Sequence, residues 1–168
     1  METNLAEAPV RHKTAGALGR DSSCNADVLG REEPMKASQF RIAAEIKPDK
    51  HDWGLGRWIS HPLSTGPKQL TVLDAIIMPG QRHDFHKHPD QEEVLFVVSG
   101  NIEQWIDRAK RILGPGDAVF IAPGTVHGSF NTGAGEARVI VIFSPCLGEV
   151  GIEMVDVANE APWKGLRN

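Results

Sequence analysis

Residues 80–100 read GQRHDFHKHPDQEEVLFVVSG and carry the most informative pattern in this 168-residue chain. Two histidines, His86 and His88, stand one residue apart, and Glu92 and Glu93 follow them closely. In a strand, side chains two positions apart point to the same face and are separated by about 6.6 Å along the strand. If this stretch is a strand, His86 and His88 can therefore converge on one metal ion.

A turn separates these histidines from the two glutamates. The sequence Pro89-Asp90-Gln91 is typical of a turn, and the apolar run after it predicts a return strand over Val94–Ser99. Glu92 and Glu93 both stand where the return strand begins, so either could supply an oxygen ligand. Gly100 follows the strand and allows a tight connection.

A second segment, residues 116–131, reads GDAVFIAPGTVHGSFN and adds a third histidine, His127. It lies far beyond His88 in the chain, so only tertiary folding can bring the two together. Three neutral imidazoles and one carboxylate are ligands that first-row divalent metals favour. Four protein ligands leave positions open on an octahedral ion, which a catalytic metal needs.

The two segments together resemble the two conserved motifs of the cupin superfamily. The first motif is matched by Gly80, His86, His88, Glu93 and Gly100. The second is matched by Gly116, Pro123, Gly124, His127 and Asn131. Ala122 stands where the second motif usually has proline, but Pro123 and Gly124 still supply the turn. The resemblance covers residues 75–150 closely.

This resemblance implies an all-β fold, the cupin-type double-stranded β-helix, which is a jelly-roll-like barrel with the metal inside. It implies one divalent transition metal, Fe, Mn, Ni or Zn, held by His86, His88, Glu93 and His127. The six-residue gap before Gly100 favours Glu93 over Glu92 as the ligand. Glu93 could also act as an acid or base, whereas Asn131 is expected to bond to the backbone at a strand end.

From residue 69 onward, short apolar runs alternate with glycine- and proline-rich turns, which is typical of a β-sandwich or barrel. The expected strands are Gln69–Met78, Phe85–His88, Val94–Ser99, Asn101–Asp107, Lys110–Leu113, Ala118–Ile121, Gly128–Asn131 and Arg138–Ser144. We also expect a first strand at Phe40–Ile46, a last strand within Val150–Val157, and an ordered loop with short strands at residues 51–68. Trp163 is expected to pack back on the barrel. Residues 1–36 are poor in core-forming side chains and predict a disordered tail, so the cupin domain is expected at residues 37–168.

The facing of three polar residues is left open by the sequence. Strict alternation along the strand would place Asp84 on the face of His86, where its carboxylate could support a metal ligand. A solvated charge at the rim is the alternative interpretation. Gln104 and Arg138 could point inward and contact a substrate.

The bulk composition limits the partners. A net charge of −4 argues against nucleic acid or an anionic membrane surface. The chain has no apolar run long enough for a membrane span and no secretory signal at its start. Its two cysteines, Cys24 and Cys146, are interpreted as free thiols, so we expect a cytoplasmic protein.

We also expect a homodimer, with Trp53 or Trp58 in the interface. The alternative roles of these two tryptophans are to line the mouth of the site or to cap the barrel.

The expected function follows from the charge of the site. A divalent ion with three neutral histidines and one carboxylate has a net charge of about +1, which favours an anionic or chelating small molecule such as a carboxylate, a diketone or an enolate. The chain contains no tyrosine, which excludes a phenol as the acid. We therefore expect a metal-dependent enzyme of the dioxygenase, isomerase or lyase type. The alternative is a non-catalytic cupin that binds a sugar or sugar acid and uses the metal structurally.

Overall fold

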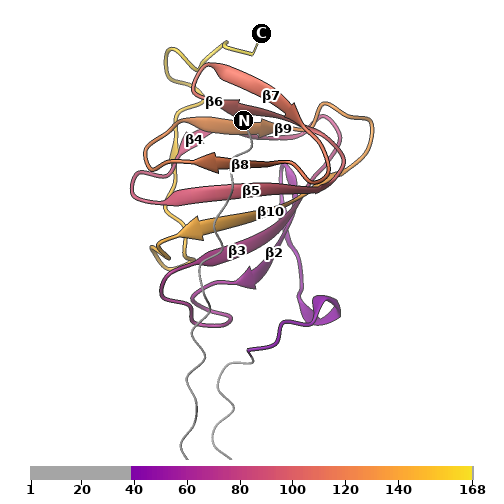
Figure 1. Ribbon diagram of the computed structural model, residues 1–168, viewed down its shortest axis with the longest axis vertical. Coiled ribbons are helices and arrows are strands. Elements are labelled where there is room, and N and C mark those ends of the chain that lie inside the picture. The colour runs from indigo at the N-terminus through magenta and orange to yellow at the C-terminus, as the bar shows by residue number, and fades with distance from the viewer. Residues whose placement is uncertain (1–38, 168) are drawn as a thin grey trace, which may run out of the picture. The chain divides into compact units, whose positions relative to one another are not determined.

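The computed structural model describes residues 39–167, and the expected tail and Cys24 lie outside these described residues. Strands are the main regular structure of the described residues, which include no α-helix. Their strands form two antiparallel sheets, which are stacked along the vertical direction of Figure 1. The expected all-β class is therefore confirmed. None of the described residues belongs to a helix that could serve as a membrane span.

The larger sheet has six strands in the order β1–β2–β3–β10–β5–β8. Their bounds are β1 (Asp49–His51), β2 (Gly54–Ser60), β3 (Thr71–Ile77), β10 (Ala137–Ser144), β5 (Glu92–Ser99) and β8 (Ala118–Ile121). The strands β2 and β3 lie lowest in Figure 1, and β10, β5 and β8 follow above them. Two strands that are distant in sequence, β3 and β10, are neighbours over seven residue pairs.

The smaller sheet has five strands in the order β11–β4–β9–β6–β7. Their bounds are β11 (Val155–Asp156), β4 (Arg82–Lys87), β9 (His127–Phe130), β6 (Ile102–Ile106) and β7 (Ala109–Leu113). All eight strands expected between residues 69 and 144 are therefore present across the two sheets, with ends that differ by a few residues.

The expectations outside that region are less accurate. Phe40–Ile46 is not a strand and contains only the 3-10 turn η1 (Ala43–Glu45), and its apolar side chains Phe40 and Ile42 stay 80% and 53% exposed. Within Val150–Val157, only Val155 and Asp156 pair, and they do so with β4. The region 51–68, expected to be mainly loop, contains the seven-residue strand β2, which pairs with β3 along most of its length.

The main apolar core lies on the inner face of the six-stranded sheet. Along β10, the buried residues alternate with more exposed ones, as expected when one face of a strand is covered. The buried cluster comprises Ala75, Ile77, Leu95, Val97, Ile102, Ala137, Val139, Val141 and Phe143. It therefore joins β3, β5 and β10 from the larger sheet to β6 from the smaller one.

A second apolar cluster covers the outer face of the five-stranded sheet. Phe85, Trp105 and Phe130 are buried there, and Trp163 of the C-terminal segment packs against them. The ring of Trp163 lies 5.8 Å from that of Phe85, which confirms that this residue packs back on the barrel. The five-stranded sheet is thus covered on both faces, and β4 and β9 are held in place from behind.

Gly100 closes the connection between β5 and β6 in the way the sequence predicts. Its φ angle is +74°, a conformation that side chains with a Cβ rarely adopt. A Cβ built at this position would also come within 2.5 Å of the backbone oxygen of Glu136. The turn therefore requires glycine.

Candidate metal centre

Three strands and the residue after one of them bring the four expected residues together. His86 lies on β4, His88 immediately follows it, Glu93 lies on β5 and His127 lies on β9. Their four potential ligand atoms all lie within 4.8 Å of one another, and all four residues are buried. His86 and His127 face each other directly across the pair β4 and β9. Glu92, by contrast, is exposed.

The turn that carries His127 is fastened to the other histidines. Gly124, with a φ of +74°, donates its backbone N–H to the backbone oxygen of His88 at 2.8 Å. This bond joins the connection between β8 and β9 to the end of β4. The two motifs, separate in sequence, therefore meet through the backbone as well as through their side chains.

All three imidazoles are oriented in the same way. Each Nδ1 lies within hydrogen-bond distance of a backbone oxygen, namely Asp84 for His86 at 2.6 Å, Glu153 for His88 at 2.7 Å and Thr125 for His127 at 3.0 Å. An Nδ1–H that is donated to a carbonyl leaves the lone pair on Nε2. The three Nε2 atoms are therefore the available ligand atoms.

Three polar atoms at the centre are left without partners. His88 Nε2, His127 Nε2 and Glu93 Oε2 are buried and accept or donate no hydrogen bond among the described residues. Glu93 Oε2 lies 3.2 Å from His88 Nε2 and 3.0 Å from His127 Nε2. Buried polar atoms without partners are costly, and nitrogen lone pairs that face a carboxylate oxygen favour a cation between them. The donor set therefore fits a divalent metal.

The protonation states also suit a cation. Burial by itself raises the pKa of Glu93, but the imidazoles of His127 and His88 outweigh it and hold the pKa well below the usual range. Burial lowers the pKa of His86 well below 6.5. Burial also lowers the pKa of His127, but the Glu93 carboxylate more than offsets it and the pKa is raised. An ion would therefore meet an ionised Glu93 and a neutral His86, and its binding to His127 would compete with protonation of that imidazole.

Gln91 supports this centre, and the sequence analysis missed it. Its side chain is almost fully buried and makes three hydrogen bonds to the loop that follows β10. The amide nitrogen donates to Pro145 O at 2.7 Å and to Gly151 O at 3.0 Å, and the amide oxygen accepts from Glu153 N at 2.7 Å. Since Glu153 O accepts from His88, Gln91 holds the loop that orients His88. The only signal in the sequence is a polar residue between a turn and a strand.

A bulge in β4 determines the direction in which the Asp84 side chain points. The register between β4 and β9 shifts between His83, which pairs with Ser129, and His86, which pairs with His127. Because β4 has one extra residue here, the alternation of its side chains is interrupted. The Asp84 carboxylate therefore accepts from Arg82 at 2.6 Å and supports no ligand; only its backbone oxygen contacts His86. The supporting role expected as one alternative for Asp84 is therefore wrong, and its carboxylate forms a partly exposed ion pair with Arg82 instead.

The two other open residues, Gln104 and Arg138, are also placed, and so is Asn131. Gln104 is buried and accepts a hydrogen bond from Ser129 at 2.6 Å. Arg138 lies on the outer face and donates to Asp74 at 2.9 Å, so it is not part of the site. Asn131 donates to the backbone oxygens of Ile77 and Gly135, both at 2.8 Å, as expected.

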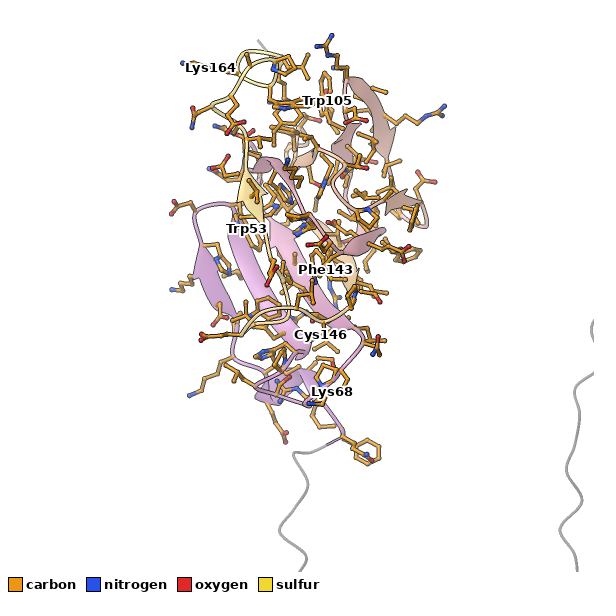
Figure 2. The ribbon with its side chains drawn as sticks, turned by 90° about the vertical axis from the view of Figure 1, so that its left-hand side faces the viewer. Trp53, Lys68, Trp105, Phe143, Cys146 and Lys164 are labelled. Atoms are coloured by element: carbon orange, nitrogen blue, oxygen red, sulfur yellow. The ribbon has the colours of Figure 1, made fainter. Side chains whose placement is uncertain are left out.

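A cavity of about 50 Å³ adjoins the cluster. Its walls are mainly apolar side chains of β3, β5 and β10, namely Leu73, Ala75, Ile77, Leu95, Val139, Val141 and Phe143. The remaining lining residues are Trp53, His83, His86, Glu93 and Ser129. Two of the lining residues, Trp53 and Phe143, lie in the middle of Figure 2, between Trp105 above and Cys146 below. Trp53 thus lines the site, whereas Trp58 donates to Asp49 at 2.9 Å, away from the cavity.

The comparisons with known proteins agree with this architecture. A family model described as the cupin domain matches residues 73–143. Protein SchB of Streptomyces halstedii is 30% identical over 129 residues, which cover 73% of this chain and 94% of SchB. Polyketide synthase CurC of Streptomyces cyaneus is 31% identical over 118 residues, which cover 70% of this chain and 75% of CurC.

Among solved structures, KdgF from Halomonas sp. matches this chain with a TM-score of 0.58 at 26% identity. The match covers 64% of this chain and 94% of the KdgF chain. The two sheets and the buried cluster of three histidines and a glutamate define a cupin fold with a site that could hold a metal. The chain belongs to the cupin family. The fold expected from the two motifs is confirmed.

Proposed function

We propose that this protein is a metal-dependent cupin enzyme that acts on a small anionic or chelating metabolite by dioxygenase, isomerase or lyase chemistry. The observation that carries the proposal is the convergence of three unpaired buried atoms, from His88, Glu93 and His127, beside a cavity. Together with His86, these residues would hold one divalent ion of Fe, Mn, Ni or Zn. When bound, the ion would supply a Lewis acid that polarises a substrate oxygen.

The cavity supports a ligand that inserts only its reacting end. At about 50 Å³ it has room for a few water molecules, since one water needs about 10–15 Å³ by this measure. His86 and Glu93 line it, so the ion would be reached from this side. Glu93 is ionised at neutral pH, because its pKa is held low, and would accept a proton rather than donate one.

The substrate class that we favour is a compound with 1,3-dicarbonyl groups. Its enolate is an anionic oxygen chelator, which suits a site with a charge of about +1. The mainly apolar walls suit a ligand whose polar atoms are concentrated at the metal. The relative CurC is named as a polyketide synthase, and polyketides as a class carry carbonyl groups on alternate carbons.

The second candidate is a non-catalytic cupin that binds a sugar or sugar acid around a structural metal. The relative KdgF of Dickeya dadantii, 30% identical over 98 residues, is named for pectin degradation, and this name favours a sugar acid. The walls oppose it, because a sugar ring presents hydroxyl groups on all sides and would leave most of them without partners in this cavity.

Metal analysis tests the proposal first. Purified protein should contain about one divalent metal per chain. The variants His86→Ala and His127→Ala should lose most of it, as should Glu93→Gln, whereas the matched variant Glu92→Gln should retain it. Stoichiometric metal in the double variant of the two histidines would overturn the ligand assignment.

Turnover separates the two candidates. Metal-loaded and metal-stripped protein are incubated with a simple 1,3-diketone and with a uronate, with and without dioxygen, and loss of each compound is followed. We expect metal-dependent loss of the diketone. Binding of the uronate without turnover, which metal removal only weakens, would favour the binding protein instead.

A further inference from the structure

The bulge in β4 turns a fourth histidine toward the cavity. In a regular strand, His83 and His86 are three positions apart and would point to opposite faces. Both nevertheless line the cavity, and their ring centroids are 4.3 Å apart at an interplanar angle of 78°. Bulges re-aim side chains in this way beside functional sites. His83 therefore lies next to the proposed ligand His86 without being one of the four clustered residues.

His83 differs from the other three histidines in its hydrogen bonding. Each of those uses its Nδ1 on a backbone oxygen, whereas the His83 imidazole makes no hydrogen bond with any of the residues 39–167. An imidazole carries at least one N–H in either protonation state. That donor lacks a partner among the described residues, and the His83 side chain lines the cavity.

Trp53 is held against His83 by a third ring. The exposed His51 stacks on Trp53 with centroids 4.6 Å apart and planes within 5°. Trp53 meets His83 nearly at right angles, with centroids 5.7 Å apart. His51 covers one face of the indole, and Trp53 also packs against the main core and lines the cavity.

The exposure of the lining residues indicates that the mouth of the cavity lies beside Trp53 and His83. Trp53, His83 and Leu73 are half-buried, and all the other lining residues are buried. A ligand that moves from solvent to the metal cluster would therefore pass Trp53 and His83. Ser129, the other polar lining residue outside the cluster, already donates its hydroxyl to Gln104. Two lining residues outside the cluster therefore have an N–H group without a hydrogen-bond partner among residues 39–167. They are His83 and Trp53.

We propose that His83 donates a hydrogen bond to an oxygen of the metal-bound ligand, and that Trp53 packs on the ligand's planar part. The site then selects planar oxygen chelators, such as enolates of 1,3-dicarbonyl compounds, over compounds that cannot become planar. This inference rests on the proposed metal site. His83 is a specificity-determining residue here, because it contacts the ligand and not the metal.

Zinc-loaded protein and a matched pair of diketones test this inference. Zinc has no redox chemistry, so binding can be measured by calorimetry without oxidation. Pentane-2,4-dione forms a planar enolate that joins both carbonyls, whereas 3,3-dimethylpentane-2,4-dione has the same carbonyls but no hydrogen between them and cannot form this conjugated enolate. We expect the wild-type protein to bind the first compound and to bind the second at least tenfold more weakly, a factor that corresponds to about 1.4 kcal/mol.

Variants of His83 and Trp53 test whether these two residues cause the selectivity for planar chelators. His83→Leu should weaken binding of pentane-2,4-dione about tenfold or more, and His83→Gln, which restores an N–H, should recover part of the loss. Trp53→Leu should weaken binding several-fold, and the matched variant Trp58→Leu should not. All four variants should retain full zinc, because none of these residues belongs to the cluster.

The outcomes separate this inference from the proposed function. Full zinc in His83→Leu, with wild-type affinity for pentane-2,4-dione, would overturn the role of His83 alone. Equal binding of the two diketones by the wild-type protein, or binding of neither, would overturn the selection of planar chelators. A wild-type protein that holds no zinc would overturn the metal site, and this inference with it.

Discussion

At the residue scale, the geometry of the candidate centre depends on hydrogen bonds between residues that lie outside it. The ring of His88 is oriented by the backbone oxygen of Glu153, and Glu153 is held by the side chain of Gln91. Residues that orient metal ligands in this indirect way commonly matter almost as much as the ligands. A polar residue that is only 1% exposed, as Gln91 is, must also keep its hydrogen bonds to be tolerated.

Replacing Gln91 by leucine should therefore weaken metal binding without removing a ligand. We expect an affinity loss of about 10- to 100-fold, measured by competition with a coloured chelator. The variant should also lose about 1–3 kcal/mol of stability, because Glu153 N and the carbonyls of Pro145 and Gly151 lose their partner. Gln81→Leu, at an exposed position, is the control. Unchanged metal affinity in Gln91→Leu would contradict the positioning role.

At the scale of elements, Glu103 on β6 fastens the C-terminal segment to the five-stranded sheet. It accepts hydrogen bonds from Trp105 at 2.9 Å, Lys110 at 3.0 Å and Arg167 at 2.7 Å. Burial by itself raises the pKa of Glu103, but these three donors outweigh it and lower the pKa to about 2. The same segment covers the outer apolar cluster, so Glu103 stabilises the packing behind β4 and β9.

A lowered pKa in the folded state means that the stabilising effect of Glu103 is fully present above its ordinary pKa of 4.5 and disappears as the pH falls toward about 2. Glu103→Gln should therefore lower the free energy of unfolding by about 1–3 kcal/mol at pH 7. The difference from the wild-type protein should shrink progressively as the pH falls through that window. Urea denaturation at several pH values measures it, with the exposed Glu136→Gln as the control. A difference that stays constant with pH would refute the argument.

The strands themselves were largely predictable, since apolar runs between glycine and proline turns are local features. Phe40–Ile46 has a similar local pattern but does not form a strand, and the side chains of Phe40 and Ile42 stay largely exposed. The bulge between His83 and His86 was not predictable either. It depends on how β4 meets β9, which only the tertiary structure determines. Its effect was to turn the Asp84 carboxylate toward Arg82 and to place His83 on the cavity lining.

At the scale of the whole molecule, the expected homodimer stays a prediction. The outer face of the six-stranded sheet exposes several large apolar side chains, namely Phe96, Val98, Phe120 and Ile142. Exposed apolar patches of this kind commonly mark association surfaces. Trp58, on β2 of the same sheet, remains available for an interface, whereas Trp53 lines the cavity.

We expect a particle of twice 18.3 kDa by light scattering, with a two-fold interface that buries at least about 1,000 Å² in total. Trp58→Ala should shift the equilibrium toward the monomer, and the exposed Lys68→Ala should not. A particle of 18.3 kDa for the wild-type protein at micromolar concentrations would contradict the dimer. The cytoplasmic location and the absence of nucleic-acid or membrane partners also remain predictions.

The sequence by itself determined the family, the class of fold and the four residues of the cluster. The reason is that their information is carried by residue type and short spacing: two histidines on one face of a strand, a glutamate after a turn, and a third histidine after a glycine turn. The tertiary structure alone decided that three Nε2 atoms and one carboxylate meet. It also decided that Gln91 holds the loop behind His88 and that His83 faces the cavity. These features join segments that are distant in sequence, and their geometry arises only when the two sheets pack.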